Sequence, residues 1–498
     1  MLAFGAFGRS AMQAEGLPVA SAGSAGGLSG GAGPSITDVE HRGIEYIPHT
    51  ERWGRPGNLF WMWAGASWNV EFVVYGAVAI VVYGLSFVQA VVVILIGNLS
   101  FLLTGLASVQ GPQAGTTAFG VSRAAFGPNG NRLPSFFNWV TQVGFEVVGI
   151  SLIVFAGILL TSKAGYTSGT PAKIIVIVLA VAIQAVLPLL GHAAVVKVLR
   201  WLALPFVVLF AVMAALTTSK VNLTQPPHGA SWGALTIVLA LMVAAGGLGW
   251  AENGNDYSRY LPRTADKKRI VLAVVLGGAI PSALLEILGA AIATGVPSAR
   301  TPNGLVAGFP SWFIWPYLIF AVLQLFAINT LDLYSSGVTL QSLVPGLKRL
   351  HCVAIDTVIC GALVAYAVFS SDFYRLLAEF VLFTIVWLGP WCAIYLVDSW
   401  LRRNRYDHAG LLNVRGGRYY RNGGIHWPAI IAQVAGMACA ALWLNAYSPY
   451  VGPLAGHIGG RIGSDFSVFA GLIAGGVVYY VLAGRSVRAE GSATPAAA

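Results

Sequence analysis

The strongest constraint on this chain is a series of long apolar stretches, each long enough to cross a lipid bilayer as a helix. About 17–25 apolar residues span the hydrocarbon core, where no water is available to bond exposed backbone groups. Only 10% of the residues are charged, against about 25% in a typical soluble domain. The sequence therefore predicts an all-α integral membrane protein. We predict twelve spans: Leu59–Tyr83, Ser86–Val109, Pro134–Leu160, Ile174–Leu190, Val195–Leu216, Gly233–Tyr260, Ile270–Thr294, Trp312–Gly337, Val353–Phe369, Val381–Val397, Trp427–Leu444 and Phe466–Leu482.

The basic residues indicate the orientation of these spans. The formal net charge is +10, and if the spans alternate in direction, most Lys and Arg residues fall on the side that carries both termini. That side holds Arg42, Arg52, Arg55, Arg123, Arg132, Lys197, Arg200, the cluster 259–269, Lys348, Arg349, the cluster 402–421, Arg485 and Arg488. The opposite side holds Lys163, Lys173, Lys220, Arg300, Arg375 and Arg461. This positive-inside pattern predicts a multi-pass cell-membrane protein with both termini cytoplasmic, and it accounts for the charge without a nucleic-acid partner.

Composition divides the rest of the chain. We predict a disordered cytoplasmic tail over 1–43, a ten-helix core over 44–400, a basic cytoplasmic loop over 401–424, two additional transmembrane helices over 425–484 and a disordered cytoplasmic tail over 485–498. The first tail contains the Gly- and Ser-rich run "VASAGSAGGLSGGAG", which is typical of flexible segments. The start "MLAFGAFGRSAM" lacks the features of a cleavable signal peptide. The histidines show no metal-ligand spacing, so neither a metal nor a cofactor is predicted, and no obligate protein partner is evident.

Polar groups at membrane depth point to the function. Ionisable groups are costly there and mark functional sites by default. The third span carries Gln142, Phe145 and Glu146 at helical spacing, so these side chains share one face. Three further spans carry such groups near mid-depth: the first (Asn69, Glu71), the sixth (Glu252, Asn253) and the eighth (Asn329, Asp332). For Glu286 and Glu379 we favour a plainer role, pairing with a neighbouring helix to help assembly.

The first and sixth spans share a local order of small residues, Trp, amide and acid: "GASWNVE" against "GLGWAEN". They occupy matching positions if the first ten helices form two five-helix repeats. Glycine-interrupted spans at matching positions are a sequence sign of a transporter site, where unwound backbone lines a cavity. We predict hinges at Gly65, Gly246 and Gly247.

These residues lead to a family resemblance. The stretches "FWMWAGASWN", "SRAAFGPNGNRLPSFFNWVTQVGFE", "GWAENGNDYSRYLPR" and "LYSSGVTLQ" resemble the nucleobase–cation symporter family, in its purine–cytosine permease branch. The resemblance covers about residues 44–482. It implies a leucine-transporter-like fold, a 5+5 inverted repeat with broken helices 1 and 6 plus two extra helices. It also implies a secondary active transporter, not an enzyme, that imports a nucleobase or similar heterocycle by cation symport and alternating access.

The resemblance also implies roles for single residues. In relatives, rings on spans 3 and 6 sandwich the heterocycle, which places Phe145 and Trp250 in the site; Gln142 and Asn329 then bond its edge. Stacking of planar rings between aromatic faces suits such a ligand. Glu146 and Asn253 are candidates to read the same edge, with Gly249 beside the ring.

The chain departs from the family pattern at three places. Phe145 stands where many relatives have Trp, "ENGNDYSRY" stands where this branch often reads "PYASDYSRY", and Asp332 stands where Asn is expected. Ala327 and Ile328 replace the hydroxyl side chains of sodium-coupled relatives. We therefore expect proton rather than sodium coupling. The ion-coupling candidates are Asn69, Glu71, Glu252 and Asp332, with Glu146 a further carboxyl that could carry the proton.

Several alternatives remain open from the sequence. Within the same architecture the solute could be allantoin, hydantoin, a thiamine-like heterocycle or an amino acid, and the coupling ion could be sodium. An amino-acid carrier lacks an evident Lys or Arg at depth for the carboxylate, although helix dipoles offer a substitute. A membrane enzyme would need a metal cluster or a nucleophile–base pair at depth, which the sequence does not show. A channel fits poorly with asymmetric broken spans.

Overall fold

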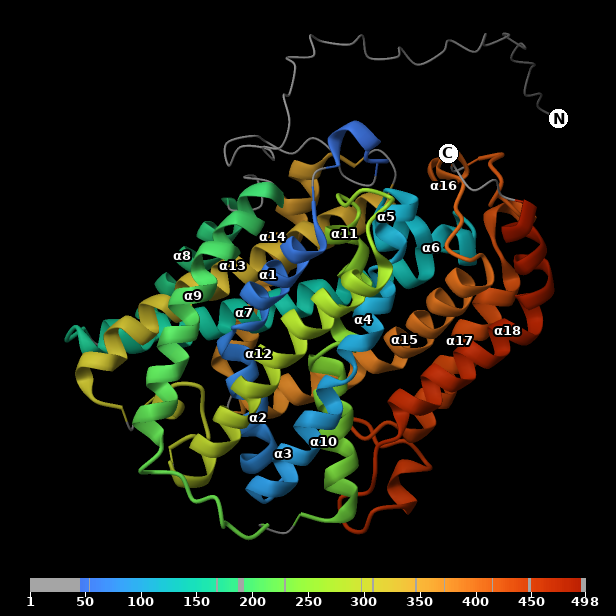
Figure 1. Ribbon diagram of the computed structural model, residues 1–498. Helices are drawn as coiled ribbons and strands as arrows, with labels where there is room; N and C mark the ends of the chain where they lie inside the picture. Colours follow the sequence, from blue (N-terminus) through green and yellow to red (C-terminus); the bar gives the residue numbers. More distant parts are fainter. Residues whose placement is uncertain are drawn as a thin grey trace, which may run out of the picture. The chain divides into compact units, whose positions relative to one another are not determined.

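The computed structural model describes residues 45–493, with gaps at 53, 167–168, 187–191, 228–229, 297, 307–308, 345–346, 371, 414 and 447–448, and without the side chains of 186, 192–200 and 349–350. The predicted tail over 1–43 lies outside the described residues. Within them the regular structure is helical, apart from an isolated bridge between Asn445 and Val451 (Figure 1).

The helices reproduce the predicted order of spans. In chain order they are α1 (Pro56–Ser67) with α2 (Val70–Val81); α3 (Phe87–Asn98) with α4 (Phe101–Ala107) and α5 (Gln110–Ala114); α7 (Arg132–Lys163); α8 (Thr170–Val186); α9 (His192–Thr217); α10 (Trp232–Ala245) with η3 (Leu248–Asn253) and α11 (Gly254–Ser258); α12 (Lys267–Gly295); α13 (Ser311–Leu343); α14 (Arg349–Phe369); α15 (Phe373–Leu401); α17 (Trp427–Trp443); and α18 (Ser467–Ala493). The connections carry η1 (His49–Glu51), α6 (Ala118–Phe126), η4 (Gly304–Val306), α16 (His408–Leu412), η5 (Asn422–Gly424) and η6 (Ala455–His457).

Length and composition support this assignment of spans. In the described part of the chain, nine helical stretches are long and apolar enough to cross a membrane, or ten if the bent pair α1–α2 counts as one span. Two shorter apolar helices, Thr170–Ala185 and Trp201–Thr217, lie where the fourth and fifth spans are predicted. Together they occupy the twelve predicted positions.

The first span is broken at Trp68 and Asn69. The axes of α1 and α2 differ by 54°, and the Asn69 side chain caps α2 by accepting a hydrogen bond from the Glu71 backbone N–H at 3.0 Å. An Asn cap satisfies a backbone donor that a new helix start leaves free. The predicted hinge residue Gly65 lies inside α1, and the break itself falls at the capping residue Asn69. The role of Gly65 as a hinge stays a prediction.

The sixth span is broken where the sequence predicts it. Helix α10 ends at Ala245, and its C-cap Gly246 adopts φ −89° and ψ −131°, outside the helical region. The neighbouring Gly247 lies so close to α4 that a Cβ there would collide with the backbone of Phe101. The chain then continues as a single 3₁₀ stretch, η3, before α11.

Two hydroxyl groups of the second span satisfy the backbone freed at this break. The Gly247 N–H donates to Ser100 Oγ at 3.0 Å, and Thr104 Oγ1 donates to the Gly247 carbonyl. A buried backbone group without a partner costs about 1–3 kcal/mol. The break is thus held open by specific partners on the second span.

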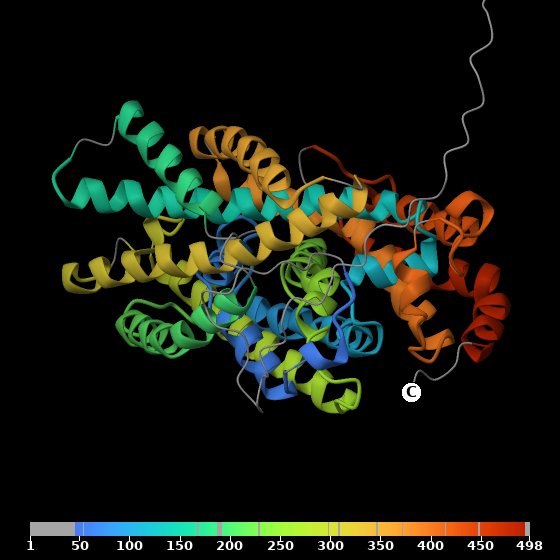
Figure 2. The same cartoon turned by 90° about the horizontal axis from the view of Figure 1, so that it is seen from above.

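Helix packing places the broken spans in the interior. Both broken spans are largely buried: 83% of an 18-residue apolar stretch of α10–α11 is buried, as is every residue of α2 except Val81. Helix α7 packs along α13, and α12 packs along α1 and α2. Helices α17 and α18 pack against each other and against α15, at one edge of the bundle in both views (Figures 1 and 2).

Helix α18 continues well past its predicted end. It runs to Ala493, so the expectation of a disordered tail over 485–498 is wrong as far as Ala493; residues 494–498 lie outside the described part. The reason is Glu490, whose carboxylate pairs with Arg402 at 2.5 Å and with Arg421. Arg402 is fully buried and also pairs with Asp398 at 2.8 Å. The basic loop therefore fastens the end of α18.

The first described residues dock on the same loop. The Tyr46 ring stacks on the His408 ring of α16, with centroids 4.5 Å apart. The Arg52 guanidinium lies 5.3 Å from the Tyr46 ring centroid, and its Nη1 donates to the Pro112 carbonyl at 2.6 Å. This segment thus ties α5 to α16.

Candidate functional site

A small cavity lies where the two broken spans meet α7 and α13. Its walls come from α2, α7, α13 and the α10–η3 break. The lining residues are Glu71, Phe72, Tyr75, Gln142, Phe145, Ala245, Gly249, Trp250, Asn253 and Asp332. Its volume is about 10 Å³, close to the minimum that holds one water molecule. The walls therefore lie against one another, and a ring-sized ligand requires them to separate.

Most of the predicted site residues meet in this cavity. From the third span come Gln142 and Phe145, as the helical spacing predicts; the break supplies Gly249, Trp250 and Asn253; the first and eighth spans supply Glu71 and Asp332. These residues are separated by up to about 260 positions in the chain. They converge because the breaks in the first and sixth spans place non-helical backbone opposite the face of α7 that carries Gln142 and Phe145.

An amide network links two walls. Gln142 Nε2 donates to Glu252 Oε1 at 3.3 Å and to Asn253 Oδ1 at 3.2 Å. The remaining atoms of this network, Gln142 Oε1 and Glu252 Oε2, are buried without a hydrogen-bond partner. Buried polar atoms are nearly always paired. Gln142 Oε1 is thus an unused acceptor on a residue that lines the cavity. Glu252 itself does not line the cavity and reaches it through Gln142.

Aromatic neighbours hold both predicted stacking rings. The Trp250 ring meets the Trp63 ring edge-on, with centroids 5.7 Å apart and planes at 86°. Phe145 meets Phe380 in the same way at 5.2 Å and 77°. Edge-to-face packing is a favourable aromatic geometry, so the neighbouring ring holds each of these two rings in one orientation.

Glu146 and Asn329 lie just behind the cavity instead of in its wall. The Asn329 amide donates to the Glu146 backbone carbonyl at 3.2 Å. Helices α7 and α13 approach so closely here that a Cβ on Gly149 would collide with Asn329 Oδ1. Asn329 Oδ1 and Glu146 Oε1 are both buried without a hydrogen-bond partner. The structure therefore brings these two residues together, one layer outside the cavity.

The cavity also contains residues that the sequence did not single out: Phe72, Tyr75 and Ala245. Tyr75 lies four residues after Glu71, and hence on the same helical face. Its hydroxyl is buried without a hydrogen-bond partner. The i, i+4 spacing from Glu71 was the signal available for Tyr75.

Of the two acids expected to pair with a neighbouring helix, Glu286 does so and Glu379, within the described part of the chain, does not. Glu286 accepts from Asn98 Nδ2 at 2.5 Å, which joins α12 to α3. Glu379 pairs with Arg375 at 2.8 Å within α15. Among the described residues, no group of three or more His, Cys, Asp or Glu side chains is arranged to hold a metal ion.

Comparison with known proteins agrees with this architecture. Residues 46–475 match the family described as "Permease for cytosine/purines, uracil, thiamine, allantoin". The chain is 32% identical to the "Putative purine-cytosine permease YxlA" of Bacillus subtilis over 89% of this chain and 96% of that protein. It is 26% identical to the purine-cytosine permease fcyB of Emericella nidulans over 87% of each chain.

A solved structure shows the same fold. Mhp1, a nucleobase-cation-symport-1 family transporter in a closed conformation with bromovinylhydantoin bound, matches with a TM-score of 0.74 at 18% identity, over 93% of this chain and 98% of that one. The expected leucine-transporter-like fold is confirmed.

Proposed function

This chain belongs to the family of permeases for cytosine/purines, uracil, thiamine and allantoin, and on that premise we propose that it imports a nucleobase, cytosine or a purine, by cation symport. It is a multi-pass membrane transporter and not an enzyme. Substrate moves by alternating access, in which the spans around the cavity separate first toward one side of the membrane and then toward the other.

The observation that supports the substrate class most directly is the composition of the cavity wall. Two aromatic rings, Phe145 and Trp250, line it together with the amides of Gln142 and Asn253. A planar heterocycle gains about 0.5–1.5 kcal/mol per aromatic contact beyond burial. Its ring N–H and carbonyl groups then satisfy amide and carboxyl atoms that are otherwise unpaired.

Proton coupling is the second part of the proposal. Glu71 and Asp332 both line the cavity, and its lining includes no Lys or Arg. Two carboxylates that share a buried cavity repel each other strongly, so uptake of a cation there is favourable. A sodium ion needs a shell of oxygen ligands, whereas Ala327 and Ile328 offer no side-chain oxygen. The neighbouring Thr330 hydroxyl donates to the Phe326 carbonyl at 2.7 Å. These features favour a proton.

The orientation completes the proposal. Both termini face the cytoplasm, on the same side as the loop 401–424, because nearly all basic connections fall on that side.

Uptake of radiolabelled cytosine into cells that lack their own nucleobase carriers tests the substrate class. We expect saturable uptake, competed by unlabelled cytosine or by a purine such as adenine or hypoxanthine, and lost in Gln142→Leu. Allantoin, hydantoin, thiamine and amino acids form the rest of the competitor panel. If one of them competes and no nucleobase does, the substrate proposal is wrong while the transport mechanism stands.

Proteoliposomes with imposed ion gradients test the coupling. We expect an inward proton gradient to drive accumulation in sodium-free buffer, and Asp332→Asn to abolish accumulation while leaving exchange of internal for external substrate. Accumulation that survives collapse of the proton gradient and requires sodium would overturn the coupling proposal.

A further inference from the structure

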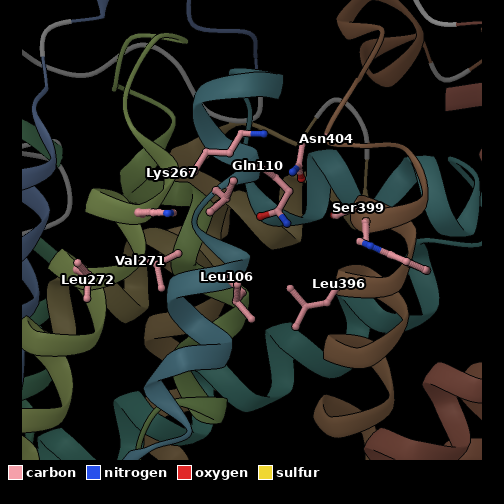
Figure 3. Close-up of a pocket in the computed structure, with 11 residues that line it drawn as sticks. Leu106, Gln110, Lys267, Val271, Leu272, Leu396, Ser399 and Asn404 are labelled. Carbon is pink, nitrogen blue, oxygen red and sulfur yellow. The ribbon is translucent and has the colours of Figure 1, made fainter. Parts of the chain in front are cut away.

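A second, larger cavity lies on the outside of the bundle. It is a groove of about 680 Å³ between the α4–α5 segment, the start of α12 and the end of α15 (Figure 3). None of its lining residues belongs to the cavity between the broken spans.

The groove is divided into an apolar and a polar part. Leu106, Val109, Val271, Leu272, Leu396 and Trp400 form its apolar wall. Figure 3 shows Lys267, Gln110 and Asn404 gathered at one end, with Leu106, Val271 and Leu396 toward the other. The polar end is the end where α12 begins and α15 finishes, next to the basic loop 401–424.

Two buried polar atoms at this end of the groove form no hydrogen bond within the protein. Gln110 is only 3% exposed, and its Oε1 is buried without a hydrogen-bond partner. Asn404 Oδ1 is buried without a partner as well. A membrane-facing surface that only contacted acyl chains would have no use for these groups, since an unpaired buried polar atom costs about 1–3 kcal/mol.

Positive charge surrounds the same end. Lys267 and Lys268 line the groove and are exposed. The guanidinium of Arg488 lies 5.8 Å from the ring centroid of Trp400, another lining residue. The nearby Asp266 carboxylate is engaged as the cap of α12, accepting from the Arg269 N–H at 2.8 Å. The local balance is therefore cationic.

We propose that this groove binds one anionic phospholipid of the cytoplasmic leaflet. Its acyl chains lie along the apolar wall, and its phosphate faces Lys267 and Lys268. The hydroxyls of its headgroup donate to Gln110 Oε1 and Asn404 Oδ1. Basic pockets between helices on the cytoplasmic side are suited to anionic headgroups, each cation near the surface contributing about 1 kcal/mol. A lipid fits better than a protein partner because the wall is apolar and is formed by helices long and apolar enough to cross a membrane.

A lipid in this groove would contact two separate groups of helices. Helix α12 packs on α1 and α2, whereas α15 packs on α17 and α18. A lipid between α12 and α15 therefore bridges the group of helices that carries the first break and the group at the edge of the bundle.

Native mass spectrometry of the full-length protein in detergent tests the proposal, with dioleoyl phosphatidylglycerol or dioleoyl phosphatidylcholine added in turn. We expect one phosphatidylglycerol to bind about 10- to 30-fold more tightly than phosphatidylcholine, and the double substitution Lys267→Gln/Lys268→Gln to remove that preference. Gln110→Leu should weaken phosphatidylglycerol several-fold without any change of charge.

A matched control removes two exposed charges outside the groove, Arg269→Gln/Lys348→Gln, and should keep the preference. Thermal unfolding midpoints of all variants establish that they are folded. Equal binding of both lipids to the native protein would overturn the proposal, as would an equal loss in the control. Displacement of the lipid by millimolar inorganic phosphate would also overturn it, because it would indicate a free-anion site.

Discussion

At the scale of single residues, Trp250 is the side chain on which substrate binding should depend most. It lines the cavity at the break and is held edge-on by Trp63. We expect Trp250→Ala to weaken substrate binding at least tenfold, a loss of about 1.4 kcal/mol or more, with normal membrane insertion. Isothermal titration of purified protein with the transported base measures this directly.

The control for this prediction is Trp312→Ala. Trp312 is 63% exposed at the start of α13, as expected for a belt residue at the membrane interface. It should leave affinity unchanged. Native affinity in Trp250→Ala would remove this ring from the site.

The sequence identified most residues of the cavity but not how each helix is turned. Helical spacing placed Gln142, Phe145 and Glu146 on one face of the helix. One helical face can contact more than one surrounding helix, so the spacing alone does not show which of these side chains reaches the cavity. The structure directs Gln142 and Phe145 to the cavity and leaves Glu146 behind it, beside Asn329. In the sequence, Tyr75 is marked by its i, i+4 spacing from Glu71, and the packing of α2 shows that it lines the cavity.

At the scale of elements, the break in the sixth span depends on Thr104. Its hydroxyl bonds the Gly247 carbonyl, and the residue is fully buried. Thr104→Val keeps the shape but removes this hydrogen bond and leaves the carbonyl with only the Trp250 N–H, at 3.2 Å. We therefore expect it to lower the free energy of unfolding by about 1–1.5 kcal/mol and to slow transport. Denaturant unfolding in detergent and initial uptake rates measure the two effects.

Thr357→Val provides the comparison. Its hydroxyl bonds the Val353 carbonyl of its own helix at 2.7 Å, far from any break, so the same chemical change should cost less than about 1 kcal/mol and leave uptake intact. Identical losses in the two variants would show that Thr104 has no special role at the break.

The docking of the first described segment on α16 should depend on pH through His408. Burial and the nearby Arg263 lower the pKa of His408 from its ordinary value of 6.5; Arg52 and His49 act in the same direction, and Asp407 opposes them. Because the unfolded chain then binds the proton more readily, the stabilisation is complete above pH 6.5. It is lost as the pH falls through the lowered pKa.

The variant His408→Phe keeps a ring to stack on Tyr46 but cannot titrate. Between pH 7.5 and 5 we expect the thermal midpoint of the native protein to fall more steeply than that of this variant. Parallel curves would contradict a role for His408 in the pH dependence.

The sequence predicted that the first and sixth spans are broken, and for the sixth span it also predicted where the break falls. The Gly246–Gly247 pair is a strong signal because a backbone of two glycines costs a helix about 2 kcal/mol. In the first span no pair of glycines marks the break; Gly65 lies inside α1, where a single glycine is tolerated, and the break falls at the Asn69 cap. Ser100 and Thr104 were not foreseen, because their partners exist only once α4 meets the break.

At the scale of the whole molecule, the end of α18 is part of the fold. Glu490 joins Arg402 and Arg421, and the Arg402 side chain is fully buried. We expect Glu490→Gln to lower the free energy of unfolding by about 2–3 kcal/mol, below the full cost of breaking a buried pair because Glu490 is 20% exposed. Denaturant unfolding measures it.

Glu379→Gln breaks a more exposed pair with Arg375, whose side chain is 38% exposed, and should cost less than about 1 kcal/mol. Equal effects of the two substitutions would mean that the Glu490 cluster is not structural. The sequence could not foresee this cluster, since the "GRSVRAEGSA" run is short, polar and glycine-containing; its helix is stabilised by distant arginines.

The near absence of free space between the broken spans also bears on affinity. If the resting protein has room there for about one water molecule, ligand first meets a minor, opened population. The measured dissociation constant then exceeds the intrinsic one by the inverse of that population. A bulky substitution that props the walls apart would therefore strengthen apparent binding and at the same time slow turnover, because the carrier must close again to change sides.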